Sequence, residues 1–474
     1  MKITFVGSEA TPFAKTGGLA DVLGSLPKTL AQMGHEVSLI MPKHQAIKTQ
    51  YEKALTTVYT GTIKVHHDDK YIGIQRLSQG GVNVYFIDNE YYFGLRPHLY
   101  GDYDDGERYG YFAHGVIRTL QEVLPSQAIV HLNDWQTGLI PYLMKYDRKY
   151  RDLQSVKTIF TIHNIAYQGR FSKALMSHLN TDYSDLLEFD DVINFLKTGI
   201  MTADQVTTVS PTYKDNLQYA YFAYGMQGVL KMRGESFSGI INGIDLETFN
   251  PATDDAIQKP YDASKMVSGK KANKKALMEQ FGLKNANLPL VGMVSRITES
   301  KGFNLVADVI PPMVEKGLIN FVLLGSGDPY YEDTFQDFHD QMPDHLGVYF
   351  GYSDGLARQV YAGSDLFLMP SRFEPCGLSQ LIAMRYGTLP VVHKTGGLKD
   401  TVEPFNEYTL EGTGFGFDTF DAEDLKQALL LAISVHGESD TFKMLQKRAM
   451  AQDFSWTQSA NDYVKLYQEV MKRG

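Results

Sequence analysis

Cysteine is almost absent from this chain, since Cys376 is the only one among 474 residues. A single cysteine excludes an intramolecular disulfide framework and a metal site built from several cysteines. Such sparing use of cysteine is typical of proteins from a reducing compartment, and we expect a cytoplasmic protein.

Long hydrophobic runs and an excess of basic residues are also missing. No stretch approaches the roughly twenty apolar residues of a membrane span, and the apolar start of the chain is too short for a signal peptide. The 45 basic residues are outnumbered by 55 acidic ones, for a formal net charge of -10. No overall positive field attracts nucleic acid or an anionic membrane, so we expect neither as a partner.

Length and apolar patterning predict an α/β protein with more than one domain, because 474 residues exceed what one hydrophobic core usually organises. A strand over 3–6, a glycine loop over 15–18, a helix over about 19–33 and a strand over 37–41 form a βαβ unit, as at the start of a Rossmann domain. A mostly parallel sheet is completed by further strands expected over 82–87, 129–132, 158–162 and 205–209.

The strand pattern then restarts, which predicts a second doubly wound domain. Its strands are expected over 290–294, 321–324, 348–350, 366–369 and 390–392. The polar segment 250–270, which contains prolines, reads as a linker. We therefore assign residues 1–248 to the first domain and 249–455 to the second. Residues 456–474 are predicted to form an amphipathic helix with apolar positions at Ala460, Tyr463, Val464, Tyr467 and Met471.

One short motif occurs twice, as KTGGLAD over 15–21 and as KTGGLKD over 394–400. Each copy follows a strand and opens a predicted helix, where free backbone N–H groups and the positive helix end favour phosphate. Lys15 adds a full charge. The motif matches no established nucleotide-binding pattern, and a glycine turn into a helix is more often only a turn.

Charged side chains follow two strands of the second domain. Arg296 and Lys301 come after strand 290–294 and are suited to clamp a pyrophosphate, although a solvated charge pair is the alternative. Glu374 follows strand 366–369 and is suited to hold sugar hydroxyls, or only to cap a helix.

Polar residues follow two strands of the first domain as well. They are Asp134, His163 and Asn164. A lone histidine is usually structural, but open α/β sheets bind their ligands at this edge, which makes His163 a candidate.

Together these motifs resemble the bacterial glycogen and starch synthases, over essentially the whole chain. The resemblance rests on SEATPFAKTGGLADV, TIHNIAYQG, TTVSPTY, NGID, VSRITESKG, PSRFEPCGL, the second KTGG and the terminal SWxxxAxxYxxLY pattern, in that order. It implies a glycosyltransferase B fold, in which two Rossmann-like domains face each other across a cleft and the last helix crosses back to the first domain. It also implies retaining transfer of glucose from ADP-glucose to the 4-hydroxyl of an α-1,4-glucan (glycogen), with no metal ion or cofactor.

The resemblance also implies roles for single residues. Glu374, His163, Arg296 and Lys301 match the family's catalytic positions, with Glu374 gripping the glucose, His163 lying over it, and the two cations joining Lys15 around the diphosphate. Asp21 and Tyr352 match nucleoside contacts. The implied substrate-binding residues are Lys15, Gly18, Asp21, Asp134, Asn164, Asn242, Tyr352, Cys376, Gly377, Thr395 and Gly396. The chain departs from the family at Asn133, where a histidine is usual.

Three other functions stay open. A UDP-glucose-dependent transferase and a non-catalytic glucan-binding protein would share the fold. A metal-dependent transferase would use a DxD motif, which Asp102-Tyr103-Asp104 spells, but we expect a solvated turn there because no hydrophobic strand precedes it.

Overall fold

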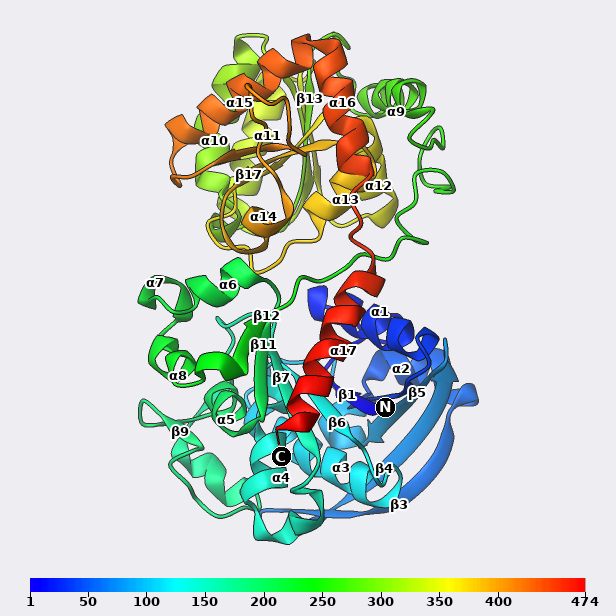
Figure 1. The fold of residues 1–474 in the computed structure, drawn as a ribbon, viewed down its shortest axis with the longest axis vertical. Coiled ribbons are helices and arrows are strands. Elements are labelled where there is room, and N and C mark those ends of the chain that lie inside the picture. The colour runs from blue at the N-terminus through cyan, green and yellow to red at the C-terminus, as the bar shows by residue number, and fades with distance from the viewer. Residues whose placement is uncertain (474) are drawn as a thin grey trace. The chain divides into compact units, whose positions relative to one another are not determined.

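The computed structural model describes residues 1–473, and the chain divides into two compact units (Figure 1). Unit 1 contains Met1–Gly243 and the chain from Trp456 onward, and unit 2 contains Ile244–Ser455. The sequence placed the first boundary after residue 248, but Ile244 already belongs to the core of unit 2 and its N–H donates to the carbonyl of Phe454 at 2.8 Å. Within the described part of the chain, none of the helices has both the length and the apolar character that a bilayer span needs.

Unit 1 is built on a mixed sheet whose strands lie in the order β12-β11-β7-β6-β1-β2-β5-β4-β3. The strands are β1 (Lys2–Val6), β2 (Glu36–Pro42), β3 (Thr56–Val65), β4 (Asp68–Gln79), β5 (Val82–Asp88), β6 (Ile129–Asn133), β7 (Lys157–Ile162), β11 (Gln205–Thr208) and β12 (Phe237–Gly239). Neighbours from β12 to β5 are parallel, whereas β4 and β3 are antiparallel. The sequence missed this hairpin because β3 is mostly exposed and has no apolar run.

Helices flank this sheet, and a small antiparallel sheet lies beside it. The helices are α1 (Gly18–Gln32), α2 (Gln45–Tyr51), α3 (Asp105–Glu122), α4 (Leu139–Tyr146), α5 (Phe195–Thr202), α6 (Pro211–Asn216), α7 (Ala220–Ala223), α8 (Gln227–Lys231) and α17 (Trp456–Lys472). The small sheet pairs β8 (Arg170–Phe171), β9 (Glu188–Phe189) and β10 (Val192–Asn194).

The C-terminal helix α17 returns to unit 1, as expected (Figure 1). It packs against α1, and the Tyr467 hydroxyl lies 2.7 Å from Nδ1 of the buried His131 on β6. The predicted apolar face was partly wrong, because Met471 is 45% exposed and Val464 only partly buried. Leu466 and Val470 are buried instead, since they continue the helical stripe through Tyr463 and Tyr467.

Unit 2 contains a fully parallel sheet in the order β15-β14-β13-β16-β17-β18. Its strands are β13 (Leu290–Val294), β14 (Asn320–Gly325), β15 (Leu346–Phe350), β16 (Leu366–Met369), β17 (Leu389–His393) and β18 (Phe415–Phe417). Its helices are α9 (Met266–Gln280), α10 (Phe303–Glu315), α11 (Pro329–Gln341), α12 (Asp354–Gly363), α13 (Ser379–Arg385), α14 (Gly396–Thr401), α15 (Ala422–Gly437) and α16 (Ser439–Met450). The two Rossmann-like sheets predicted from the sequence are confirmed.

The segment 250–270 is not a free linker, as its polar composition had suggested. Helix α9 begins within it at Met266, and Tyr261 is 2% exposed. The Tyr261 hydroxyl donates to the carbonyl of Tyr386 at 2.7 Å, and the Tyr386 hydroxyl donates to the carboxylate of Asp254 at 2.5 Å. A few anchoring side chains without any helical or strand period therefore attach this segment to unit 2.

Candidate functional site

A cavity of about 180 Å³ opens in unit 2 at the carboxyl ends of β13 and β16. Four of the residues expected in the donor site line it. They are Arg296, Lys301, Glu374 and Gly377. The cavity lies where open parallel sheets bind ligands, because loops from neighbouring strands diverge at this edge.

The charges in this cavity are arranged around Glu374. Its carboxylate Oε2 accepts from Nζ of Lys301 at 2.6 Å and from the hydroxyl of Ser371 at 3.1 Å. The Glu374 side chain is only 8% exposed, whereas Arg296 is exposed. The start of α13, which has no side-chain cap, also borders the cavity through Leu378 and Ser379. Two cations and a helix N-terminus can bind a phosphate here, beside a carboxylate that can accept from hydroxyls.

The second glycine loop supports Glu374 from behind. The N–H of Gly397 donates to the main-chain carbonyl of Glu374 at 3.0 Å. Gly396 has a φ of +45°, and a Cβ built on it would lie 2.0 Å from the same carbonyl oxygen. Thr395 is buried at 5% exposure, as is Cys376. None of Thr395, Cys376 and Gly396 lines the cavity. They support the loop that carries Glu374 from the side away from the cavity.

Tyr352 is 77% exposed and is not among the residues that line this cavity. The nucleoside contact that the family resemblance implies for it stays a prediction.

In unit 1 the first glycine loop carries the expected lysine, but this lysine has an ion-pair partner. Nζ of Lys15 lies 2.7 Å from the carboxylate of Asp21, which was expected to contact the nucleoside. Gly18 is exposed and begins α1, whose N-terminus has no side-chain cap. The loop therefore presents an uncapped helix N-terminus next to Lys15, whose charge is balanced by Asp21 in the first turn of α1.

Two residues that contact this loop, Glu9 and Tyr100, were not identified from the sequence. Glu9 is 2% exposed, and its carboxylate accepts from the N–H and the hydroxyl of Thr16, at 2.5 and 2.7 Å. Burial raises the pKa of Glu9, although the bonds from Thr16 oppose the change. The hydroxyl of Tyr100 also contacts the Thr16 hydroxyl. The position of Glu9 just after strand β1 was the available signal; Tyr100, far away in sequence, gave none.

Asp134, His163 and Asn164 come together at the ends of β6 and β7. Asp134 Oδ1 accepts from the N–H groups of His163 at 2.8 Å and Asn164 at 3.4 Å. The Asp134 backbone has φ 58° and ψ 179°, a conformation that is strained for any residue but glycine and that clusters at functional sites. Burial raises the pKa of Asp134 to about 7. A strained backbone that carries a carboxyl with a raised pKa is typical of a site that handles ligands or protons.

The His163 ring has one partner among residues 1–473, since its Nε2 lies 2.9 Å from Oδ1 of Asn133. Burial lowers the pKa of His163 to about 3, so the imidazole is neutral. Asn242 lies near the end of unit 1, is 6% exposed, and its Oδ1 has no hydrogen-bond partner within the described chain.

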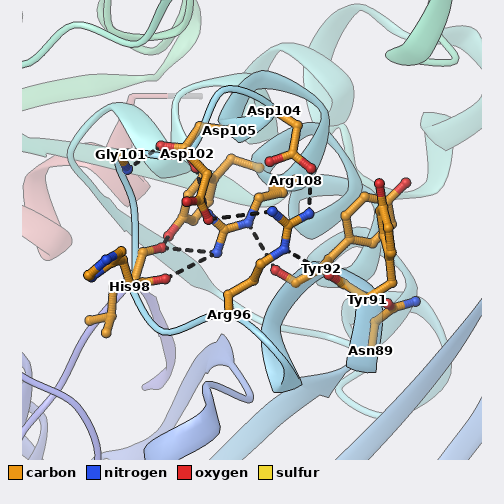
Figure 2. Close-up of polar contacts among 12 residues, drawn as sticks. Asn89, Tyr91, Tyr92, Arg96, His98, Gly101, Asp102, Asp104, Asp105 and Arg108 are labelled. Carbon is orange, nitrogen blue, oxygen red and sulfur yellow. Dashed lines mark hydrogen bonds and ion pairs between the residues drawn. The ribbon is translucent and has the colours of Figure 1, made fainter.

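The DxD motif is not a solvated turn, contrary to expectation (Figure 2). Oδ2 of Asp102 lies 2.9 Å from NH1 of the fully buried Arg108, and Oδ2 of Asp104 lies 2.6 Å from NH2 of Arg96. Asp105 accepts from Arg108 at 2.6 Å. The three carboxylates lie within 4.8 Å of one another, but two guanidinium groups already neutralise most of their charge. This network fixes the start of α3 and the preceding loop, which carries Tyr100.

Two family models match this chain. A starch synthase catalytic domain matches residues 2–232, and a glycosyl transferases group 1 domain matches residues 274–449. The chain is similar to a glycogen synthase of Exiguobacterium sibiricum, with 43% identity over 98% of both chains. It is also similar to a glycogen synthase of Ligilactobacillus salivarius, with 44% identity over 99% of this chain and 100% of that one.

A solved structure resembles the chain over its full length. It is the catalytic domain of starch synthase IV from Arabidopsis thaliana, bound to ADP and acarbose. The match has a TM-score of 0.91 and 34% identity, and it covers 100% of this chain and 99% of the other.

Proposed function

Because this chain belongs to the glycogen and starch synthase family of glycosyltransferases, we propose that it transfers glucose from ADP-glucose to the 4-hydroxyl at the non-reducing end of an α-1,4-glucan. Unit 2 takes the donor and unit 1 the glucan acceptor. The anomeric configuration is retained.

The unit 2 cavity is the observation that carries this proposal. It gathers Arg296, Lys301 and Glu374 at one sheet edge, where two cations can hold a diphosphate beside a carboxylate that can hold sugar hydroxyls. The ADP bound to the starch synthase relative supports a diphosphate donor with adenine as its base. When such a donor binds, its phosphate competes with Glu374 for Lys301, which frees the carboxylate for the glucose.

Unit 1 has its own candidate residues. Lys15 can bind a phosphate once it leaves Asp21, and Gly18 offers a backbone N–H at the start of α1. His163 lies over the transferred glucose, and Asp134 and Asn164 contact the sugars.

The chemistry proposed is stabilisation of the leaving group. Negative charge grows on the departing diphosphate, and fixed cations stabilise it without a proton from a protein side chain. A double displacement would need a nucleophilic carboxylate below the anomeric carbon. No such carboxylate is assigned here, since the proposed role of Glu374 is to hold the glucose hydroxyls. As the family resemblance implies, the glucan hydroxyl attacks from the face of the leaving group, the bond from the anomeric carbon to the diphosphate breaks, and the hydroxyl proton passes to a diphosphate oxygen.

A donor panel tests this function. Purified protein is given glycogen with ADP-, UDP- or GDP-glucose, and the released nucleotide and labelled glucan are both measured. We expect ADP-glucose to have the highest kcat/KM. A higher value for UDP-glucose would overturn the donor assignment, and no turnover of any donor would leave a non-catalytic glucan-binding protein.

The same assay in excess EDTA tests the metal-dependent alternative. We expect the rate to persist, because the proposed clamp is made of lysine and arginine and because Arg96 and Arg108 already engage the DxD carboxylates. A rate that collapses and returns with Mn²⁺ would favour the alternative.

A further inference from the structure

Asn133 holds the ring of His163. It lies at the end of β6, is 1% exposed, and its side chain bridges three groups. Its Nδ2 donates to the carbonyls of Val6 at 3.0 Å and His131 at 3.2 Å, while Oδ1 lies 2.9 Å from Nε2 of His163.

These contacts determine which nitrogen of His163 carries the proton. Both partners of Nδ2 are carbonyl oxygens, which can only accept, so the amide of Asn133 cannot be reversed without losing two bonds. Its Oδ1 then faces Nε2 and can only accept as well. A neutral His163 must therefore carry its proton on Nε2 and keep a lone pair on Nδ1. Among residues 1–473, no other group bonds to this ring.

We propose that Asn133 is a positioning residue that fixes His163 in the Nε2–H tautomer, so that Nδ1 accepts a hydrogen bond from a hydroxyl of the sugar being transferred. This inference rests on the proposed function for its ligand, but the tautomer itself does not depend on it. Asp134 adds to the effect, because its carboxylate holds the N–H of His163 while the neighbouring Asn133 holds the ring.

The chain contains a matched control in unit 2. Asn320 is fully buried, donates through Nδ2 to the carbonyls of Lys284 and Asn285, and has Oδ1 2.8 Å from Nδ1 of His345. The same amide-to-imidazole arrangement thus occurs where no sugar contact is proposed. Asn320→Leu should lower the melting temperature and leave kcat and its pH profile unchanged in the folded protein.

The first test is direct. Protein labelled with ¹⁵N-histidine reports the tautomer of each ring by NMR, and a His163→Gln variant assigns the signal. We expect a neutral Nε2–H ring at His163 from about pH 6 to pH 9, in agreement with its low pKa. An Nδ1–H signal would overturn the inference, whatever the enzyme's donor.

Kinetics then test the role. Asn133→Leu removes the acceptor, and we expect kcat to fall about 10-fold with little change in the KM for the donor, as for other residues that orient a histidine. Asn133→Asp keeps an oxygen facing Nε2–H but loses both bonds from Nδ2 to the carbonyls of Val6 and His131, so its melting temperature is measured first. In the folded variant the carboxylate should favour a protonated His163 and cause a new loss of kcat at low pH. The titratable neighbours His131 and Asp134, and Glu9 which acts on Asp134, are the same in all variants.

The outcomes separate the two proposals. Wild-type kcat in a folded Asn133→Leu protein, or an Asn133→Asp profile that parallels that of the wild type, would overturn the positioning role while the glucosyl transfer stands. A wild-type protein without transferase activity would overturn the proposed function, and the NMR signal would still decide the tautomer.

Discussion

The two KTGGL segments have the same five residues but different structures. In unit 1, Gly17 is extended and α1 begins at the exposed Gly18. In unit 2, α14 begins one motif position earlier, at Gly396, which has a φ of +45° and is buried. The same five residues therefore form an exposed loop in unit 1 and a buried turn in unit 2.

Their partners explain the difference. In the first loop a side chain, the Glu9 carboxylate, binds the N–H of Thr16, and Lys15 pairs with Asp21 of the motif itself. In the second loop a main chain, the Glu374 carbonyl, binds the N–H of Gly397, and Lys394 pairs at 2.6 Å with Asp418 outside the motif. The motif specifies a turn into a helix. The contacts around the turn decide whether it is exposed and able to bind a ligand, or buried and in support of another loop.

The largest effect is expected at the residue that the second loop supports. Glu374→Ala should lower kcat by at least about 10²-fold, because it removes a preorganised charge from the sugar, and Glu374→Gln should lie between it and the wild type. Donor affinity should change less than kcat, since the grip strengthens as the sugar gains positive character. The measurements are kcat, donor affinity and melting temperature on both variants.

A folded Glu374→Ala enzyme with wild-type turnover would remove this residue from the proposed site. A lower melting temperature with normal turnover would leave it only the structural role of pairing with Lys301.

The second effect contrasts one glycine from each loop. A Cβ on Gly397 would lie 2.2 Å from the carbonyl oxygen of Cys376, whereas nothing lies within 4 Å of a Cβ on Gly18. Gly397→Ala should therefore destabilise unit 2 by about 2 kcal/mol through overpacking. Gly18→Ala should stabilise α1 by about 0.5 kcal/mol, because alanine loses less backbone entropy in a helix. Denaturant unfolding measures the change in the free energy of unfolding for each variant. Equal changes would show that the two loops do not differ in how tightly they are packed.

Much of the fold was predictable because buried parallel strands are short apolar runs. The strands at 290–294 and 366–369 are those of the structure, Leu290–Val294 and Leu366–Met369. The β3–β4 hairpin and the attached segment 250–270 were not predictable in this way. Their order comes from exposed pairing and from single anchors such as Tyr261, which leave no periodic pattern.

The residues that line the unit 2 cavity were largely predictable for the same reason. Arg296 and Glu374 follow apolar strands that a parallel sheet must align, so their side chains meet at one edge. The sequence could not show that Lys15 pairs with Asp21, or that Arg108 pairs with Asp102 of the DxD motif. These pairings depend on side-chain reach and burial, which vary while the motif stays the same.

The two motif lysines offer a third contrast. Lys15→Ala should lower kcat/KM about 10-fold with little change in stability, because its pair with Asp21 is exposed and such pairs contribute about 0 to 1 kcal/mol. Lys394→Ala breaks an equally short pair, but it borders the buried loop and should leave kcat/KM within about 2-fold of the wild type. Steady-state kinetics on both variants checks this, and equal losses would show that the two loops do not differ in their access to the donor.

The smallest effect concerns the carboxylate that only the first loop uses. Burial raises the pKa of Glu9 above its ordinary value of 4.5, so in the window between the two values the folded protein holds a proton that the unfolded chain has released. The free energy of unfolding therefore falls as the pH rises through this window, and the full loss of stability is reached above it.

Glu9→Gln removes the titrating group but keeps an oxygen that accepts from the N–H of Thr16. We expect the melting temperatures of variant and wild type to be close at pH 4 and the variant to be the more stable at pH 8, with the difference growing between. Substitution in the second loop offers no such titration, because the Glu374 carbonyl that binds Gly397 carries no proton at any pH. Parallel melting curves for Glu9→Gln and wild type across this range would show that the first loop does not respond to pH through Glu9.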